Sequence, residues 1–384
     1  MKLELIATAT FGLEAVVKRE VQDLGYKILK SEDGKITFLG DERAIARSNL
    51  WLRSADRVLL KMGEFTALTF EDLFQQVKGI SWEELIPPDG KFTVTGSSVK
   101  SKLHSVPSCQ SITKKAIVQR LGETYGLTHF EETGAEYTVK VALLKDRATI
   151  TVDTSGAGLH KRGYRAADVA APIKETLAAA MVQLSFWKEG RFLADPCCGS
   201  GTIPIEAAML GRNIAPGISR GFASDDWELI GPDIWKEERQ AAYKAIRHDA
   251  DIRIQGSDLD PKAIEAAREN ALEAGVDDCI EFHIMDITKL RPGDEPNGII
   301  ITNPPYGERI GDKKAIERIY KSLGFYMNKN PGWSLFLITT DKEAEQKLVG
   351  RPADRRRKLY NGRLEVCYYQ FHGKKGAKDE AGNQ

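Results

Sequence analysis

The stretch FLADPCCGSGTIPIEAA, residues 192–208, decides the fold of the C-terminal half. A short apolar run ends at Asp195, a loop with Gly199 and Gly201 follows, and helical spacing begins near Thr202. A strand, a glycine turn and a helix in this order are typical of a doubly wound α/β sheet, in which a ligand can approach the backbone of the glycine loop. Taken alone, the loop also fits a tight strand-to-helix turn without a ligand.

The glycine loop lacks the features of two common nucleotide-binding motifs. A dinucleotide fingerprint requires Gly or Ala three positions after Gly201, and Pro204 stands there. A phosphate-binding P-loop requires a lysine directly after the glycines, and Thr202 follows instead. These differences disfavour a nicotinamide-dependent oxidoreductase and a P-loop nucleotidase.

Strand-like and helical segments alternate from about residue 166 onward. This alternation predicts an α/β domain over residues 166–373, Rossmann-like, with a mostly parallel seven-stranded sheet. Asn361 and Gly362 separate two strand-like runs and predict a type I′ hairpin, which brings the last strand into the sheet antiparallel.

The N-terminal half shows a different order of elements. Residues 1–65 read strand, helix, two strands, helix, strand, which is the order of a ferredoxin-like unit. Residues 66–155 form a second α/β stretch, residues 156–165 are expected to be a linker, and the polar tail 374–384 is expected to be disordered. The sequence assigns no role to a long insertion between residues 211 and 250.

Composition is typical of a globular protein, with 42% hydrophobic and 29% charged residues among 384. No apolar run has the length of a membrane span, and the N-terminus does not resemble a signal peptide. The five cysteines and six histidines show no metal-binding or disulfide spacing, so we expect no metal site and a cytoplasmic location.

The net charge of zero hides an uneven distribution of charge. Residues 91–122 contain six basic residues and no acid, and HKRGYR (160–165) is a further basic cluster. Such clusters favour docking on phosphate, although a solvated face balanced by acids elsewhere in the fold is the simpler reading.

Acidic residues end the next two predicted strands of the C-terminal half. Asp258 is expected to bind ribose hydroxyls, because an acid at the tip of the second strand lies beside the glycine loop. Asp286 is placed to accept a hydrogen bond from an adenine amino group, with Met285 and Ile287 flanking the ring. Together with Asp195, these acids predict one adenosine pocket at the carboxyl edge of the sheet.

The segment ITNPPYGERIG, residues 301–311, follows the fourth predicted strand and carries the candidate catalytic residues Asn303, Pro304, Pro305 and Tyr306. Proline holds the preceding residue extended and has no N–H. The Asn303 side-chain oxygen and the Pro304 carbonyl can then accept both hydrogens of one NH₂ group and direct its lone pair at an incoming methyl group. Tyr306 can stack on the base, at about 1–3 kcal/mol. The simpler reading is a proline-rich strand exit.

Four motifs resemble those of class I S-adenosylmethionine-dependent methyltransferases that act on exocyclic amines: DPCCGSGT (195–202), GSDLDP (256–261), MDI (285–287) and NPPYGERIG (303–311). The N-terminal half resembles the THUMP-domain RNA methyltransferases, together with SGAGLHKRGYR (155–165) and APIKETLAAAMV (171–182). Within these, the chain is most similar to the bacterial 23S rRNA guanine-N2 methyltransferases.

The resemblance implies three domains: a ferredoxin-like subdomain (1–65), a THUMP RNA-binding domain (66–155) and a methyltransferase domain (166–373). It implies S-adenosylmethionine as cofactor and 23S rRNA or a pre-ribosomal particle as partner, without a membrane or a metal. The implied cofactor-binding residues are Asp195, Cys197, Gly199, Gly201, Thr202, Asp258, Leu259, Asp286, Ile287 and Asn303. The basic clusters described above, and not the resemblance, supply the candidate RNA-binding residues, which are Lys100, Lys102, Lys114, Lys115, Lys161, Arg162 and Arg165.

Several alternatives stay open at this point. The Asn-Pro-Pro-Tyr motif is shared with adenine-N6, cytosine-N4 and glutamine-N5 enzymes and does not by itself select a substrate. A tRNA guanine-N2 or an adenine-N6 methyltransferase fits the same motifs, and a non-catalytic RNA-binding assembly factor is the alternative outside enzymes.

Overall fold

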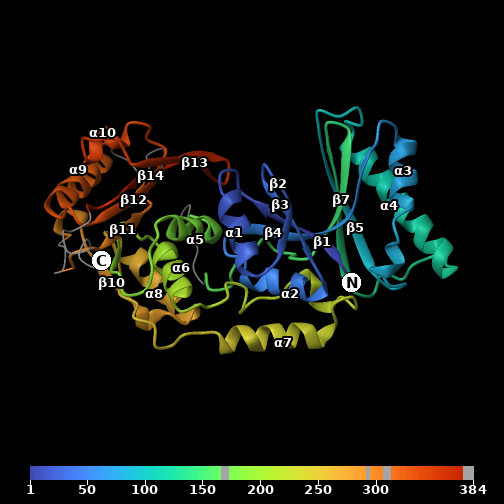
Figure 1. The fold of residues 1–384 in the computed structure, drawn as a ribbon, viewed down its shortest axis with the longest axis horizontal. Helices are drawn as coiled ribbons and strands as arrows, with labels where there is room; N and C mark the ends of the chain where they lie inside the picture. Colours follow the sequence, from blue (N-terminus) through green and yellow to red (C-terminus); the bar gives the residue numbers. More distant parts are fainter. Residues whose placement is uncertain (166–172, 291–294, 306–312, 375–384) are drawn as a thin grey trace, which may run out of the picture. The chain divides into compact units, whose positions relative to one another are not determined.

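The computed structural model describes residues 1–165, 173–290, 295–305 and 313–374 (Figure 1). The chain forms two compact units, each built on one seven-stranded sheet. Unit 1 comprises Met1–Ala9, Val17–Leu159 and Arg220–Ala242. Unit 2 comprises Thr10–Val16, His160–Ser219 and Tyr243–Gln384.

The first half of unit 1 confirms the ferredoxin-like order of elements. Its strands and helices alternate as β1 (Leu3–Ala9), α1 (Glu14–Asp23), β2 (Lys27–Glu32), β3 (Lys35–Gly40), α2 (Glu42–Trp51) and β4 (Ala55–Thr66). Strand β1 pairs antiparallel with both β3 and β4, as this topology requires.

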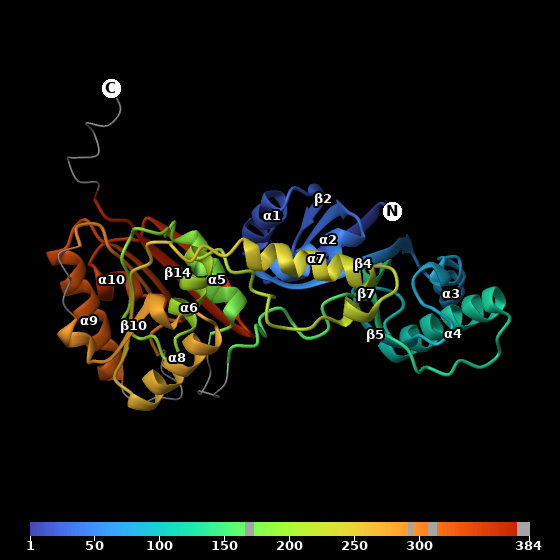
Figure 2. The same cartoon turned by 90° about the horizontal axis from the view of Figure 1, so that it is seen from below.

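The second half of unit 1 continues the same sheet. It contains α3 (Phe70–Lys78), β5 (Lys91–Val99), α4 (Val106–Tyr125), β6 (Glu136–Leu144) and β7 (Arg147–Asp153). The long strand β4 pairs with β1 and with β7, so the sheet runs β2-β3-β1-β4-β7-β6-β5 without a break. Helices α3 and α4 lie side by side against the β5 end of the sheet (Figures 1 and 2). The sequence did not predict α3, a short helix with only two buried residues.

The insertion supplies part of unit 1. Trp227 stacks on Tyr137 of β6, with ring centroids 4.9 Å apart, and its indole N–H donates to the carbonyl of Glu136 at 3.1 Å. Phe222, Trp227, Ile230 and Trp235 are all buried in the core of unit 1. Residues 220–242 therefore form an arm that completes this core, although they follow the glycine loop in sequence.

Helix α7 (Gly231–Lys244) of this arm lies beside α2 (Figures 1 and 2). The buried carboxylate of Glu238 accepts hydrogen bonds from Arg43 at 3.0 Å and from Arg47 at 2.9 Å, both on α2. A buried carboxylate with two guanidinium partners fixes the register of α7 on α2, because a shift of the helix that removed both partners would leave a buried charge uncompensated.

The division between the two units falls within residues 156–165, the predicted linker. Gly156–Leu159 belongs to unit 1 and His160–Arg165 belongs to unit 2. A fragment that starts at Ala166 would lack His160–Arg165, and it would leave the apolar side chains of the arm without the core that covers them.

Unit 2 has the predicted mostly parallel sheet, in the order β10-β9-β8-β11-β12-β14-β13. The parallel strands are β8 (Leu193–Asp195), β9 (Ile254–Asp258), β10 (Ile280–Ile284), β11 (Ile299–Thr302) and β12 (Ser334–Thr339). The antiparallel strands are β13 (Arg355–Asn361) and β14 (Leu364–Phe371), and β14 pairs with β12.

The predicted type of the last hairpin turn was wrong. Asn361 pairs with Leu364, which makes Gly362 and Arg363 the two loop residues. Gly362 has a φ of +65°, whereas neither Asn361 nor Arg363 has a positive φ. Positive φ at the first loop position alone is the pattern of a type II′ turn.

Helices cover both faces of this sheet (Figures 1 and 2). One face carries α5 (Glu175–Leu184), α6 (Thr202–Gly211) and α8 (Pro261–Glu273), and the other carries α9 (Lys313–Lys329) and α10 (Ala344–Leu348). The Tyr368 hydroxyl of β14 donates to the Met181 carbonyl of α5 at 2.8 Å, and the Tyr320 hydroxyl of α9 lies 3.0 Å from the Thr339 hydroxyl of β12. Every residue of β12 is buried, as expected for a strand covered on both sides.

None of the helices in the described part of the chain has the length and apolar character that a membrane span needs.

Candidate active site

The loop between β8 and α6 has backbone angles that favour glycine, with φ of +53° at Gly199 and +80° at Gly201. A Cβ on Gly201 would lie 3.1 Å from both Ala267 and Phe282, so the loop is closely packed on that side. Within the described residues, nothing lies within 4 Å of a Cβ on Gly199. The backbone at Gly199 is therefore open to a ligand just before the N-terminus of α6.

Asp258 lies directly against this loop. One carboxylate oxygen accepts the backbone N–H of Gly199 at 3.0 Å, and the other accepts the N–H of Asp260 at 3.0 Å. A carboxylate has about four acceptor positions, so two positions are left for a diol at this half-buried side chain. The structure thus brings the predicted ribose ligand and the glycine loop together.

Asp195 joins the tips of β8 and β11. Its carboxylate is 1% exposed and accepts hydrogen bonds from the Thr302 hydroxyl at 2.8 Å and from the Cys197 N–H at 3.2 Å. Burial, with a smaller contribution from the charge of Asp258, raises the pKa of Asp195 to about 7, although the hydrogen bonds from Thr302 and Cys197 act in the opposite direction. Sequence reasoning missed Thr302, whose only signal was its position just before Asn303.

Asn303 follows β11 directly, and Pro304 after it is buried. The side-chain oxygen of Asn303 is buried and has no hydrogen-bond partner among the residues that the structure describes. A buried oxygen without a donor costs about 1–3 kcal/mol, so this atom is poised to accept an N–H from a ligand. Pro305 is exposed, and Tyr306 lies outside the described residues.

Asp286 has more partners than predicted. It accepts the Thr288 N–H at 2.9 Å at the start of η4 (Ile287–Lys289), and it pairs with Arg318 of α9 at 2.8 Å. The Thr288 backbone bond, followed by the Thr288 hydroxyl and Arg318, lowers the pKa of Asp286. An adenine amine would share this carboxylate with Thr288 and Arg318.

The apolar residues beside these acids are arranged differently from the prediction. Ile287, expected to flank the adenine ring, is buried in the core of the sheet. Leu259 and Ile284 are 62% and 57% exposed at the tips of β9 and β10. These two side chains are the apolar surface that the edge offers to a flat ring, and Met285 between Ile284 and Asp286 is half-buried.

The cysteines of the loop are not activated as nucleophiles. Burial raises the pKa of Cys197 and of Cys198 well above the ordinary value, which keeps both thiols protonated. Within the described residues, no group of three or more His, Cys, Asp or Glu side chains is arranged to hold a metal ion.

The basic residues predicted in unit 1 fall into two groups. Lys91 donates to Glu136 at 2.6 Å and Arg120 pairs with Glu83, so these two are neutralised as the simpler reading expected. The four predicted RNA contacts are all exposed: Lys100, Lys102, Lys114 and Lys115. Of these four, only the ammonium of Lys114 has an ion-pair partner among the described residues, Glu132 at 4.0 Å.

Sequence reasoning missed a fifth basic residue of this surface. The β6–β7 turn, Lys145 and Asp146, packs on the segment after β5, where the Asp146 N–H donates to Ser101 at 2.9 Å. The N–H of Lys145 donates to the carbonyl of Val99, which places exposed Lys145 beside Lys100 and Lys102. More than forty residues of sequence separate Lys145 from the other two, and no local pattern links them.

Two of the three basic residues predicted to contact RNA in unit 2 point into the protein. Arg162 is 3% exposed and pairs with the buried Glu206, which also accepts the Tyr164 hydroxyl at 3.1 Å. Arg165 pairs with the buried Glu175 of α5 at 2.7 Å. Lys161 is exposed. Burial and ion pairing make Arg162 and Arg165 unavailable to phosphate.

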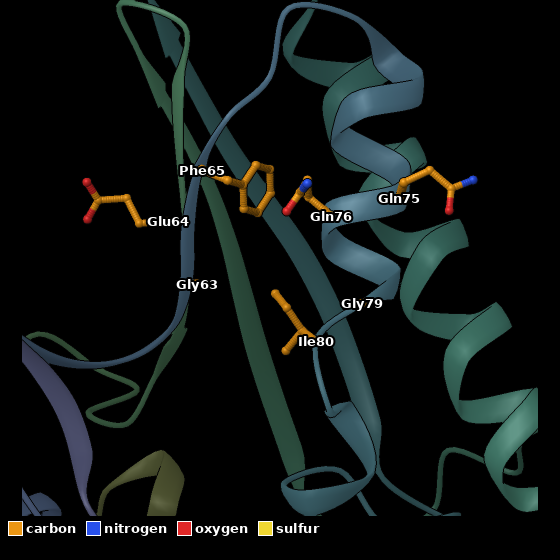
Figure 3. Close-up of a pocket in the computed structure, with 7 residues that line it drawn as sticks. All are labelled: Gly63, Glu64, Phe65, Gln75, Gln76, Gly79 and Ile80. Carbon is orange, nitrogen blue, oxygen red and sulfur yellow. The ribbon is translucent and has the colours of Figure 1, made fainter.

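Each of the two units contains a pocket. A pocket of about 480 Å³ in unit 1 lies between the end of β4 and α3, where Phe65, Gln76 and Ile80 point into the space and Glu64 points away (Figure 3). A pocket of about 360 Å³ in unit 2 is lined by residues 160–163, Arg165 and 173–175. The predicted cofactor and catalytic residues belong to unit 2, so the pocket of unit 1 is not the active site.

The carboxyl edge of this sheet thus has the organisation of a class I methyltransferase: a glycine loop, acids at strand tips and an Asn-Pro-Pro segment. Residues 162–370 match the family described as "RMKL-like, methyltransferase domain", residues 4–59 match the RlmL ferredoxin-like domain, and residues 67–153 match the THUMP domain. The chain belongs to this family of methyltransferases, and the predicted THUMP methyltransferase architecture is confirmed.

Individual relatives agree in fold and length. The chain is 50% identical to the Bacillus subtilis (strain 168) protein named "Putative RNA methyltransferase YpsC", over 97% of both chains. It is 46% identical, with a TM-score of 0.93 over 97% of both chains, to a Listeria monocytogenes structure described as "a predicted N6-adenine-specific DNA methylase". It is 44% identical, with a TM-score of 0.92 over 98% and 99% of the two chains, to SMU.472, described as "a putative methyltransferase complexed with SAH".

The raised pKa of Asp195 predicts a pH dependence of stability. Its folded pKa of about 7 lies above the unfolded value near 4, so the folded protein binds a proton that the unfolded chain has lost. The contribution of Asp195 to the free energy of unfolding is fully present below about pH 4. It falls as the pH rises to about 7, by up to roughly 4 kcal/mol in total. Urea unfolding at a series of pH values between 4 and 8 measures this change in the free energy of unfolding.

The matched variant is Asp195→Asn, which keeps the shape of the side chain and does not titrate. The difference in the free energy of unfolding between the two proteins should vary with pH in this window and be constant above it. Parallel pH profiles for the two proteins would show that Asp195 titrates normally.

Proposed function

We propose that the protein is an S-adenosylmethionine-dependent RNA methyltransferase that methylates the exocyclic N2 amine of a guanine in 23S rRNA. The observation that carries the proposal is the buried side-chain oxygen of Asn303 at the tip of β11, for which the described part of the chain offers no hydrogen-bond donor. It directly follows Thr302, which is bonded to Asp195 beside the glycine loop. An acceptor for an amine and a loop open to a cofactor therefore meet at one edge.

The residues present fit the cofactor. The free positions of Asp258 suit the ribose, Asp286 with exposed Leu259 and Ile284 suits an adenine ring, and the open backbone at Gly199 suits the methionine half. Asp195, Cys197, Gly201 and Thr202 surround the loop that would receive the methionine half. When bound, the cofactor supplies a methyl group activated by its sulfonium.

The protein's own part in the reaction is alignment. The Asn303 oxygen accepts one N–H of the target amine, and the Pro304 carbonyl accepts the other. An aromatic amine is a poor nucleophile because its lone pair is delocalised into the ring. Holding both hydrogens directs the lone pair outward, and these bonds strengthen as positive charge develops on the nitrogen. Alignment of this kind contributes about 7–11 kcal/mol.

RNA as the substrate is supported by the THUMP domain and by the exposed lysines of unit 1. We choose guanine N2 in 23S rRNA as the target, because the motifs are most similar to those of the bacterial 23S rRNA guanine-N2 methyltransferases. The rRNA could be free or part of a pre-ribosomal particle. A tRNA guanine or an adenine N6 amine presents the same pair of hydrogens to Asn303, so the identity of the modified nucleoside separates these substrates. A cytoplasmic location belongs to the same proposal.

Asn303→Ala should abolish methylation without abolishing cofactor binding. The variant loses an acceptor used in the transition state, which costs about a hundred-fold or more in turnover. Mass analysis of nucleosides in 23S rRNA and tRNA from a deletion strain should show one missing N2-methylguanosine in 23S rRNA. The wild-type chain should restore it and Asn303→Ala should not.

Lys321→Ala is the control, because this lysine is exposed on α9. Restoration of the modification by Asn303→Ala would remove Asn303 from the chemical step. A missing modification in tRNA, or on an adenine, would reassign the substrate while leaving the methyltransferase activity in place.

Lys100→Ala combined with Lys102→Ala should make RNA binding less dependent on salt. Each phosphate contact to a single strand contributes about 0.7 log units of affinity per log unit of salt, so the slope should fall by about 1.4. Fluorescence titration of an rRNA fragment over a range of salt measures the slope. Lys91→Ala should leave it unchanged, because Lys91 is paired with Glu136. An unchanged slope in the double variant would place the RNA elsewhere.

A further inference from the structure

The Arg165 side chain joins three parts of unit 2. Its guanidinium donates to the Glu175 carboxylate in the first turn of α5 at 2.9 Å, to the Ser200 hydroxyl at 3.3 Å and to the Thr202 hydroxyl at 3.2 Å. Ser200 lies in the glycine loop, and Thr202 is the first residue of α6. One side chain thus links the start of α5 to both sides of Gly201.

The segment that carries Arg165 is itself anchored. Arg162 and Tyr164 both bond to Glu206 of α6, and all three side chains are buried. The glycine loop is held from the opposite side, where the Asn270 amide of α8 donates to the Ser200 carbonyl at 3.0 Å. Packing therefore fixes the distance between the segment that carries Arg165 and the glycine loop.

Arginine suits this position better than lysine. The Arg165 and Glu175 side chains are 18% and 6% exposed, so the pair is largely removed from water. A planar guanidinium has five N–H donors in a fixed fork and can serve the carboxylate and both hydroxyls at once, whereas an ammonium is a point charge. These donors face the interior, which explains why Arg165 does not belong to an RNA surface.

We propose that Arg165 is a positioning residue for the methionine half of the cofactor. It holds the Ser200 and Thr202 side of the glycine loop against the start of α5 and so preforms the surface that receives the amino-acid end. This inference rests on the proposed function, because it takes the glycine loop as the place of that half of the cofactor.

The proposed role of Arg165 affects the binding of one half of the cofactor and not of the other. The ribose and adenine side depends on Asp258 and Leu259 at the end of β9 and on Asp286 after β10. The hydrogen bonds of Arg165 reach α5, the glycine loop, α6 and the Ile173 carbonyl, and none of those given by the structure reaches β9 or β10. Loss of Arg165 should weaken binding of the amino-acid part and spare that of the nucleoside part.

Calorimetry of the full chain with two ligands tests this separation. S-adenosylhomocysteine contains the amino-acid part, and 5′-deoxy-5′-methylthioadenosine lacks it. Arg165→Met should bind S-adenosylhomocysteine about ten-fold more weakly or worse, because the surface that receives the amino-acid part is no longer preformed, and should bind methylthioadenosine with nearly wild-type affinity. The affinity of Arg165→Lys for S-adenosylhomocysteine should lie between those of the wild type and Arg165→Met, because lysine can keep the bond to Glu175 but cannot bridge both hydroxyls.

Arg363→Met is the matched control, because Arg363 is exposed in the β13–β14 turn, and it should bind both ligands as the wild type does. Equal loss of both ligands in Arg165→Met, or loss of neither, would overturn the proposal. If Arg165→Met unfolds at a much lower temperature than the wild type, Arg165→Lys with near-normal stability replaces it. The affinities of this variant for the two ligands are then compared in the same way. Failure of the wild-type chain to bind S-adenosylhomocysteine would instead overturn the proposed function.

Discussion

The hydrogen bond from the Thr302 hydroxyl to the buried Asp195 carboxylate is the interaction on which the proposed site depends. Strand β8 lies between β9 and β11, and the chain proceeds outward from β8 in both directions, so a crevice is expected at this switch point. The bond closes the tips of β8 and β11 against each other at that crevice. It thereby sets Asn303 beside the glycine loop, whose other side is bonded to Asp258.

Each unit also depends on a segment from the opposite part of the sequence. Unit 1 includes Arg220–Ala242, and unit 2 includes Thr10–Val16, where the Phe11 ring contacts Tyr360 with centroids 6.1 Å apart. Ion pairs of the buried Glu238 with Arg43 and Arg47 hold the exchanged segment in unit 1. Buried charges of this kind are sensitive to the loss of one partner, which makes the exchanged segments specific. The insertion that the sequence left without a role is thus a structural part of the N-terminal unit.

Much of the fold and part of the candidate site could be predicted because the signals are local. Alternating strands and helices, Gly199 and Gly201, and the positions of Asp195, Asp258 and Asn303 at strand ends are all readable within a few residues. What could not be predicted depends on long-range packing. The burial of Arg162 and Arg165 requires knowledge of Glu206 and Glu175, the basic cluster with Lys145 requires the β6–β7 pairing, and the continuous sheet of unit 1 requires both partners of β4. A basic motif such as HKRGYR has the same composition whether it faces RNA or the interior.

If the carboxyl edge of β8, β9 and β11 holds the cofactor, the Asp258→Ala variant should bind S-adenosylhomocysteine more weakly than the wild type. The control is Asp260→Ala, because Asp260 caps α8 by accepting the Lys262 N–H at 2.9 Å and is assigned no contact with the ribose. Loss of a charge-assisted bond to ribose predicts binding about ten-fold weaker or worse in Asp258→Ala and a near-normal value in the control. Wild-type affinity in Asp258→Ala would contradict the placement of the cofactor at this edge.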